Sequence, residues 1–182
     1  MKQINYFPIA GFTALYVVTV FVTAFLGFVS PYAWVFFPVV ASLLGAFSYY
    51  CVALRWHQFG VGTLLTFILG TFLLAIGECD MQKALLILLA GILSDIVRGM
   101  MGSASTNGLS FAYPVLSLGV IAWILPLWTR TAWYYDGATE ELGENYAKGL
   151  MQFASVWGFL LVVVATAIAG FVGIRSASKL IR

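Results

Sequence analysis

Few residues in this 182-residue chain could carry out chemistry, and they are scattered along it. The single histidine, His57, lies beside Arg55 in a polar turn. One histidine cannot build a multi-histidine zinc site, an HExxH motif or a convincing Ser-His-Asp set. We therefore expect no catalytic residues, no bound metal or cofactor of the protein's own, and no enzymatic activity.

Asp95 and Arg98 are three residues apart, a spacing that places both side chains on one face of a helix. Ionisable residues inside a membrane helix are functional candidates by default. Because this pair lies near the end of an apolar segment, a local ion pair or an anchor at the helix end is the simpler interpretation. A role in gating or in contacting a partner is the alternative.

The glycine-rich segment GMMGSASTNG (99–108) lacks the lysine of a Walker A motif. If the protein takes part in an energy-driven process, ATP hydrolysis must therefore come from another chain.

A third group of residues could bind a flat, partly apolar small molecule. Aromatic, sulfur and cationic side chains gather in the polar segments 30–34, 78–82 and 128–149. An interfacial aromatic belt would explain scattered Trp and Tyr residues, whereas three consecutive aromatic residues before a long polar stretch also favour a binding loop. Cys79, Met81 and either Tyr134 or Tyr135 could ligate the iron of a haem. The candidate ligand-binding residues are Tyr32, Trp34, Cys79, Met81, Trp128, Arg130, Trp133, Tyr134 and Tyr135.

The elements that must position these residues are membrane helices. The chain is 62% hydrophobic and only 9% charged, which is more apolar surface than a soluble domain of this length can bury. Long apolar runs without alternation predict helices, because backbone polar groups in lipid must be satisfied internally. We expect one all-α domain over residues 1–182, a compact bundle of six transmembrane helices at about 5–28, 35–54, 61–76, 84–97, 109–127 and 150–174.

The basic residues predict the orientation of this bundle. With six spans, six of the nine Lys and Arg residues fall on the side of the termini and three on the other side. The positive-inside rule then places both termini in the cytoplasm and the aromatic segments outside. The net charge of +2 is too small to indicate nucleic acid as a partner.

Small residues recur at helical spacing. Ala10 and Ala14 form one such pair in the first span. In lipid, small residues four apart allow two helices to approach closely. Similar pairs occur later, including Ala41 with Gly45 and Ser42 with Ala46, so spacing alone does not separate internal packing from contact with a partner.

The length, the six spans and the AxxxA pattern of the first helix resemble the substrate-binding S components of energy-coupling factor (ECF) transporters. The segments GFTALY, FFPVVASLLGA, LLAGILSDIVR and YPVLSLGVIAWILPL, in this order, are similar to the Trep_Strep-type integral membrane family, also called MptS-like. The resemblance implies a subunit in the bacterial cell membrane that captures a micronutrient, a vitamin-like compound or a tetrapyrrole such as haem, on the outer face. It further implies docking through Ala10 and Ala14 on a transmembrane coupling subunit, which two cytoplasmic ATPase subunits drive.

Two other classes of function remain open from the residues themselves. A membrane assembly or scaffold protein would need no ligand pocket. A membrane-embedded enzyme would need an intramembrane acid–base or metal cluster, which the sequence does not indicate.

Overall fold

The computed structural model describes residues 6–102 and 105–181, and the regular elements in these ranges are all helical. The predicted all-α fold is therefore confirmed. Six longer helices are α1 (Tyr6–Ala24), α2 (Pro31–Ala53), α3 (Val61–Ala75), α4 (Met81–Met100), α5 (Thr106–Leu118) and α9 (Val156–Leu180). The shorter elements are η1 (Phe25–Phe28), η2 (Gly119–Trp123), α6 (Pro126–Thr129), α7 (Thr131–Leu142) and α8 (Glu144–Met151).

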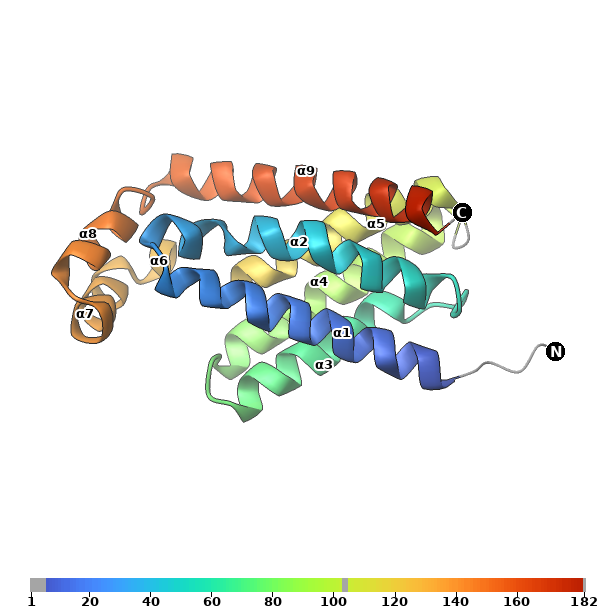
Figure 1. Ribbon diagram of the computed structural model, residues 1–182, viewed down its shortest axis with the longest axis horizontal. Helices are drawn as coiled ribbons and strands as arrows, with labels where there is room; N and C mark the ends of the chain where they lie inside the picture. Colours follow the sequence, from blue (N-terminus) through green and yellow to red (C-terminus); the bar gives the residue numbers. More distant parts are fainter. Residues whose placement is uncertain (1–5, 103–104, 182) are drawn as a thin grey trace.

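The six longer helices form a closed bundle. Around it, α1 packs on α2, α2 on α9, α9 on α5, α5 on α4, α4 on α3 and α3 on α1. The start of α1 and the end of α9 lie at one end of the bundle, and α7 and α8 lie at the opposite end (Figure 1). We call the end that carries α7 and α8 the outer end, following the orientation predicted from the basic residues.

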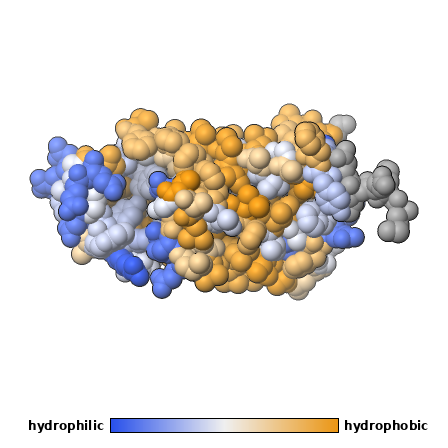
Figure 2. Space-filling model, turned by 90° about the horizontal axis from the view of Figure 1, so that it is seen from below, coloured by the Kyte–Doolittle hydropathy of each residue, from blue (hydrophilic) through white to orange (hydrophobic). Residues whose placement is uncertain are grey.

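The surface of this bundle is that of a membrane protein. Within the described ranges, three helical segments are long and apolar enough to cross a membrane: Tyr6–Phe28, Pro31–Ala53 and Val156–Leu180. On the face shown in Figure 2, an apolar band covers the middle of the molecule, and the outer end is hydrophilic. The α3 helix is apolar but shorter than the other three. A membrane bundle is therefore shown, whereas the count of six crossings stays a prediction.

Several helices begin directly after an N-cap residue, so their first residues differ from the predicted ones. The Ser30 hydroxyl accepts hydrogen bonds from the backbone N–H groups of the first turn of α2, so this helix begins at Pro31 rather than at 35. Asp80 caps α4 in the same way, through the N–H of Lys83. Ser155 caps α9, so the last helix runs from 156 to 180 rather than from 150 to 174.

Close packing between α2 and α9 depends on small residues. A Cβ added at Gly173 would lie 2.7 Å from the carbonyl oxygen of Leu43 and 2.9 Å from Cβ of Ala46. Both distances are shorter than van der Waals contact, so a larger residue would push the helices apart. The small residues Ala41, Ser42, Gly45 and Ala46 are all buried. These later small pairs therefore serve packing inside the bundle.

Asp95 and Arg98 bind segments other than their own helix. The Asp95 carboxylate accepts hydrogen bonds from Gly62 N (2.8 Å), Thr63 N (2.8 Å) and Thr63 Oγ1 (2.7 Å) at the start of α3. The Arg98 guanidinium donates to carbonyl oxygens at the end of α2 and in the following turn, those of Ala53, Trp56 and Gln58. The two residues thus hold the end of α2, the following turn and the start of α3 against α4. Their spacing predicts only a local ion pair or an anchor at the end of their own helix.

The polar stretch 128–149, expected as a loop, is mostly helical. It contains α7 and α8, which are separated by Gly143 at φ +90°. This left-handed conformation is readily available to glycine and costly for other residues, so it ends α7 and redirects the chain. The outer end is therefore covered by two short helices, rather than by an irregular loop.

Candidate functional site

A cavity of about 530 Å³ opens at the outer end of the bundle. Its walls come from the end of α1 with η1, the start of α2, the α3–α4 turn with the start of α4, η2, the start of α6, α7 and α8. A cavity of this volume is within the range of small-molecule sites. Eight of its lining residues are aromatic: Phe21, Phe25, Phe28, Trp34, Trp123, Trp133, Tyr134 and Tyr146.

Two hydrogen bonds attach α7 and α8 to the rest of the bundle. The Trp34 indole N–H donates to the Tyr134 hydroxyl oxygen at 2.5 Å, which links α2 to α7. The Tyr146 hydroxyl donates to the Gly27 carbonyl oxygen at 2.6 Å, which links α8 to η1. Burial raises the pKa of Tyr134 to about 12, and burial also raises the pKa of Tyr146 to about 12. Both phenols therefore stay neutral at physiological pH and keep these bonds.

Three of the nine predicted ligand-binding residues line the cavity: Trp34, Trp133 and Tyr134. They come from segments 100 residues apart in the chain, and the fold brings them together. Trp34 also stacks on Phe37, with ring centroids 5.1 Å apart, which fixes the indole plane against the core.

Four other predicted residues, Tyr32, Trp128, Arg130 and Tyr135, do not line the cavity. The Tyr32 hydroxyl donates to Oε1 of Gln152. The Trp128 indole donates to the Phe153 carbonyl oxygen and borders a separate apolar hollow beside α9. Arg130 and Tyr135 are absent from the lining as well. The Tyr32 and Trp128 side chains thus bond to Gln152 and Phe153, between α8 and α9, and do not line the cavity.

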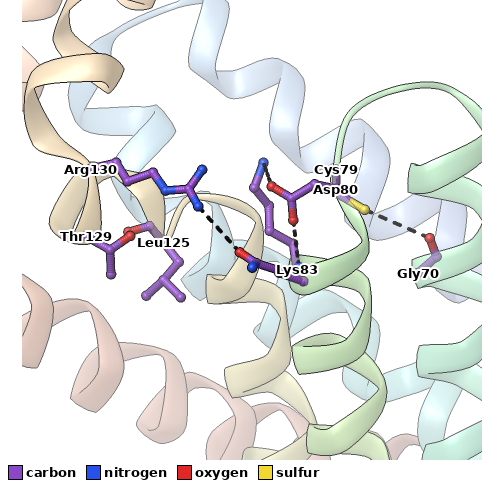
Figure 3. A network of polar contacts seen from close by, with 8 residues as sticks. Gly70, Cys79, Asp80, Lys83, Leu125, Thr129 and Arg130 are labelled. Atoms are coloured by element: carbon purple, nitrogen blue, oxygen red, sulfur yellow. Dashed lines mark hydrogen bonds and ion pairs between the residues drawn. The ribbon is translucent and has the colours of Figure 1, made fainter.

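Cys79 and Met81, the two predicted sulfur ligands, do not line the cavity either. Cys79 is buried, and its Sγ points at the Gly70 carbonyl oxygen of α3 at 4.0 Å (Figure 3). Burial raises the pKa of the Cys79 thiol, which disfavours the thiolate that a metal would need. The Met81 side chain is 62% exposed on the surface. The prediction that these two residues lie at the ligand site is therefore not supported by their positions.

Three charged side chains line the cavity: Glu78, Lys83 and Glu141. The Lys83 ammonium lies 3.6 Å from the Asp80 carboxylate, and Asp80 also caps α4 (Figure 3). The hydrogen bond from the Lys83 backbone N–H is the main cause that lowers the pKa of Asp80. Beside this pair, Arg130 Nη2 donates to Gln82 Oε1 at 3.5 Å, which joins the α6–α7 corner to the start of α4.

Ala10 and Ala14 lie on the outside of the bundle. Both are exposed, and a Cβ added at the neighbouring Gly11 would meet no atom within 4 Å. The opposite face of α1 packs inward through Ile9, Tyr16 and other buried residues. This strip of small residues therefore takes no part in packing within the chain, unlike the small residues of α2 and α9.

The amino-acid sequence matches the model of one protein family over residues 7–182. That family is described as "Hypothetical bacterial integral membrane protein (Trep_Strep)". The chain belongs to the Trep_Strep family. Neither the curated proteins nor the solved structures contain a match. Membership of Trep_Strep and the apolar helices together establish a bacterial integral membrane protein.

The Trep_Strep chain also contains cavity residues that sequence reasoning missed. Phe21, Phe25 and Phe28 belong to the apolar run of the first span, where aromatic residues are expected whether or not they bind anything. Trp123, in η2, was missed for the same reason, because it also belongs to an apolar run of the sequence. A 3.6-residue periodicity could have placed Phe21, Phe25 and Phe28 on one face of a helix. Glu78, Lys83 and Glu141 were recognisable only as charged residues of outer segments, and Tyr146 as one more aromatic residue of the polar segment 128–149.

Proposed function

We propose that this protein is the substrate-binding subunit of an ECF-type importer, which captures a small molecule in the outer cavity. The observation that carries the proposal is the cavity itself, about 530 Å³ in volume and lined by eight aromatic side chains. An aromatic belt at the membrane surface would place Trp and Tyr rings around the outside of the bundle. Here aromatic residues of six helical elements, α1, η1, α2, η2, α7 and α8, line one hollow instead.

The exposed strip on α1 supports a docking role. Ala10 and Ala14 leave a shallow surface on the outside of the bundle, against which a helix of another protein could pack closely. In this proposal that helix belongs to a transmembrane coupling subunit, and two cytoplasmic ATPase subunits supply the energy. The protein itself is then no enzyme and holds no cofactor of its own.

The lining favours a flat, partly apolar ligand, such as a vitamin-like compound or a tetrapyrrole. Neither Cys79 nor Met81 lines the cavity, so neither is placed to ligate the iron of a haem there. Tyr134 does line the cavity, but its hydroxyl oxygen already accepts a hydrogen bond from Trp34. Recognition in this proposal therefore depends on ring contacts rather than on metal ligation.

Filling the cavity tests this proposal. Gly137 lines the cavity, and a Cβ added there would meet no atom within 4 Å, so Gly137→Trp should occupy the hollow without disturbing α7. The matched control is Ala132→Trp, an exposed position on the same helix outside the lining.

Mass spectrometry and an absorption spectrum of the protein as purified would identify a retained small molecule. We expect the wild type and Ala132→Trp to retain it and Gly137→Trp to lose it. Equal retention by Gly137→Trp would show that the cavity is not the site.

A further inference from the structure

The charged residues around the outer cavity indicate which charge a ligand should carry, which the shape of the cavity does not indicate. Two carboxylates, Glu78 and Glu141, and one ammonium, Lys83, line the hollow. They come from the α3–α4 turn, the last turn of α7 and the first turn of α4. The excess of one negative charge belongs to the lining itself and does not depend on residues farther away.

The single cation of the lining is already compensated. Lys83 Nζ lies 3.6 Å from Asp80 Oδ2, and only 16% of the Lys83 side chain is exposed. Asp80 is held in place by its cap on α4. An anionic group of a ligand would therefore have to compete with Asp80 for Lys83, and would also meet the carboxylates of Glu78 and Glu141.

The aromatic rings, like these carboxylates, favour a positively charged ligand. The face of an aromatic ring carries negative electrostatic potential and attracts a cation that lies over it, most strongly for Trp. Trp34, Trp123 and Trp133 all line the cavity together with five Phe and Tyr residues. Rings and carboxylates together form a site with a preference for positive charge.

We propose that the ligand of this cavity is a flat aromatic cation, with its rings between the aromatic side chains and its positive charge near Glu78 and Glu141. This inference rests on the proposed function and narrows its substrate class. It disfavours a haem, because the two propionates of that molecule are anionic at neutral pH. It favours heteroaromatic compounds with a fixed or protonated nitrogen.

Three probes of similar size and different charge test the inference. They are 1-methylquinolinium, 2-methylquinoline and quinoline-2-carboxylate, which at pH 8 are cationic, neutral and anionic. Dissociation constants are measured by calorimetry with the full chain in nanodiscs of uncharged lipid. The variants are Glu78→Gln, Glu141→Gln and the double variant. Glu140→Gln is the matched control, because Glu140 is exposed on the same helix as Glu141 and lies outside the lining.

We expect the cationic probe to bind wild type about tenfold more tightly than the neutral one, and the double variant to lose about that factor for the cation alone. Glu140→Gln should stay within about twofold of wild type, because Glu140 lies outside the lining, and an exposed charge that does not contact the ligand is screened by solvent and salt.

Equal or tighter binding of the neutral or anionic probe would overturn the inference while leaving the cavity as a ligand site. An equal effect of the Gln substitutions on all three probes would also overturn it. If none of the probes binds wild type, the inference fails as well, and retention by Gly137→Trp then decides separately whether the cavity holds a ligand.

Discussion

The indole nitrogen of Trp34 donates a hydrogen bond to the hydroxyl oxygen of Tyr134, at 2.5 Å and across 100 residues of sequence. Both residues line the outer cavity, so this bond holds α7 over the cavity and shapes its wall at the same time. The position of α7 and the affinity for a ligand should therefore depend on the same contact.

Tyr134→Phe removes the acceptor and leaves the half-buried Trp34 N–H without its partner. The loss should destabilise the attachment of α7 by about 1–3 kcal/mol. We expect faster amide hydrogen exchange in α7 and weaker ligand binding, with little change in the six longer helices. Tyr135→Phe is the control, because Tyr135 lies outside the lining. Unchanged exchange in Tyr134→Phe would show that this bond does not hold α7.

Trp133→Ala tests whether the outer aromatic residues bind the ligand or only mark the membrane interface. Trp133 lines the cavity although 62% of it is exposed. Loss of one aromatic contact costs about 1 kcal/mol beyond the lost area, so affinity should fall several-fold. The control is Trp157→Ala, which removes an indole that is 80% exposed at the start of α9. If both variants lose only detergent stability and keep their affinity, the belt interpretation is correct.

The Asp95 carboxylate should be essential to the attachment of the first turn of α3 to α4. Asp95→Ala leaves the N–H groups of Gly62 and Thr63 without acceptors, at a cost of about 1–3 kcal/mol for each. Asp95→Asn keeps one carbonyl oxygen and should lie between alanine and wild type. Thermal unfolding in detergent measures both variants. A midpoint of Asp95→Ala equal to that of wild type would contradict the structural role assigned to this residue.

Cysteine labelling tests the orientation of the bundle. A membrane-impermeant reagent applied to intact cells should modify Asp136→Cys on α7 and spare Ser176→Cys near the end of α9 until the cells are permeabilised. Both positions are exposed, and the native Cys51 and Cys79 are buried, so the signal comes from the new thiols. The neighbouring Ser178 would be a poor reporter, because it is buried. The reverse pattern of labelling would place the cavity on the cytoplasmic side.

The membrane class and the helical fold could be predicted from the sequence because hydropathy is a property of whole segments. The helices α7 and α8 could not be predicted, because their residues are mostly polar and no apolar run marks them.

Cys79 and Met81 show why the site was only partly predictable. They are two residues apart, yet one is buried toward Gly70 and the other is exposed at the start of α4. Asp80 between them marks the start of α4 as its N-cap, but the sequence does not show which of the two side chains is buried.

The small residues Ala10 and Ala14 on α1 also show what sequence spacing alone cannot predict. Ala10 and Ala14 have the same spacing as Ser42 and Ala46, but the first pair is exposed and the second is buried. Spacing predicts that a helix can approach closely, whereas the fold decides whether the approaching helix belongs to the same chain. The exposed pair is therefore the one available to a partner.

Substitution of Ala14 tests the central claim, that the protein binds its ligand alone and needs the α1 strip only for transport. Ala14→Trp adds a large side chain on the outside of the bundle. Ala46→Trp adds the same side chain at a position with no exposure, where overpacking of this kind costs typically about 1–3 kcal/mol or more. Each variant is measured twice, as ligand affinity of the purified protein and as uptake by cells that also carry the coupling subunit and ATPases.

We predict that Ala14→Trp keeps the affinity of wild type and loses most uptake, because a coupling helix can no longer approach the strip. Ala46→Trp should lose both. Loss of affinity in Ala14→Trp, or uptake equal to that of wild type, would contradict the account.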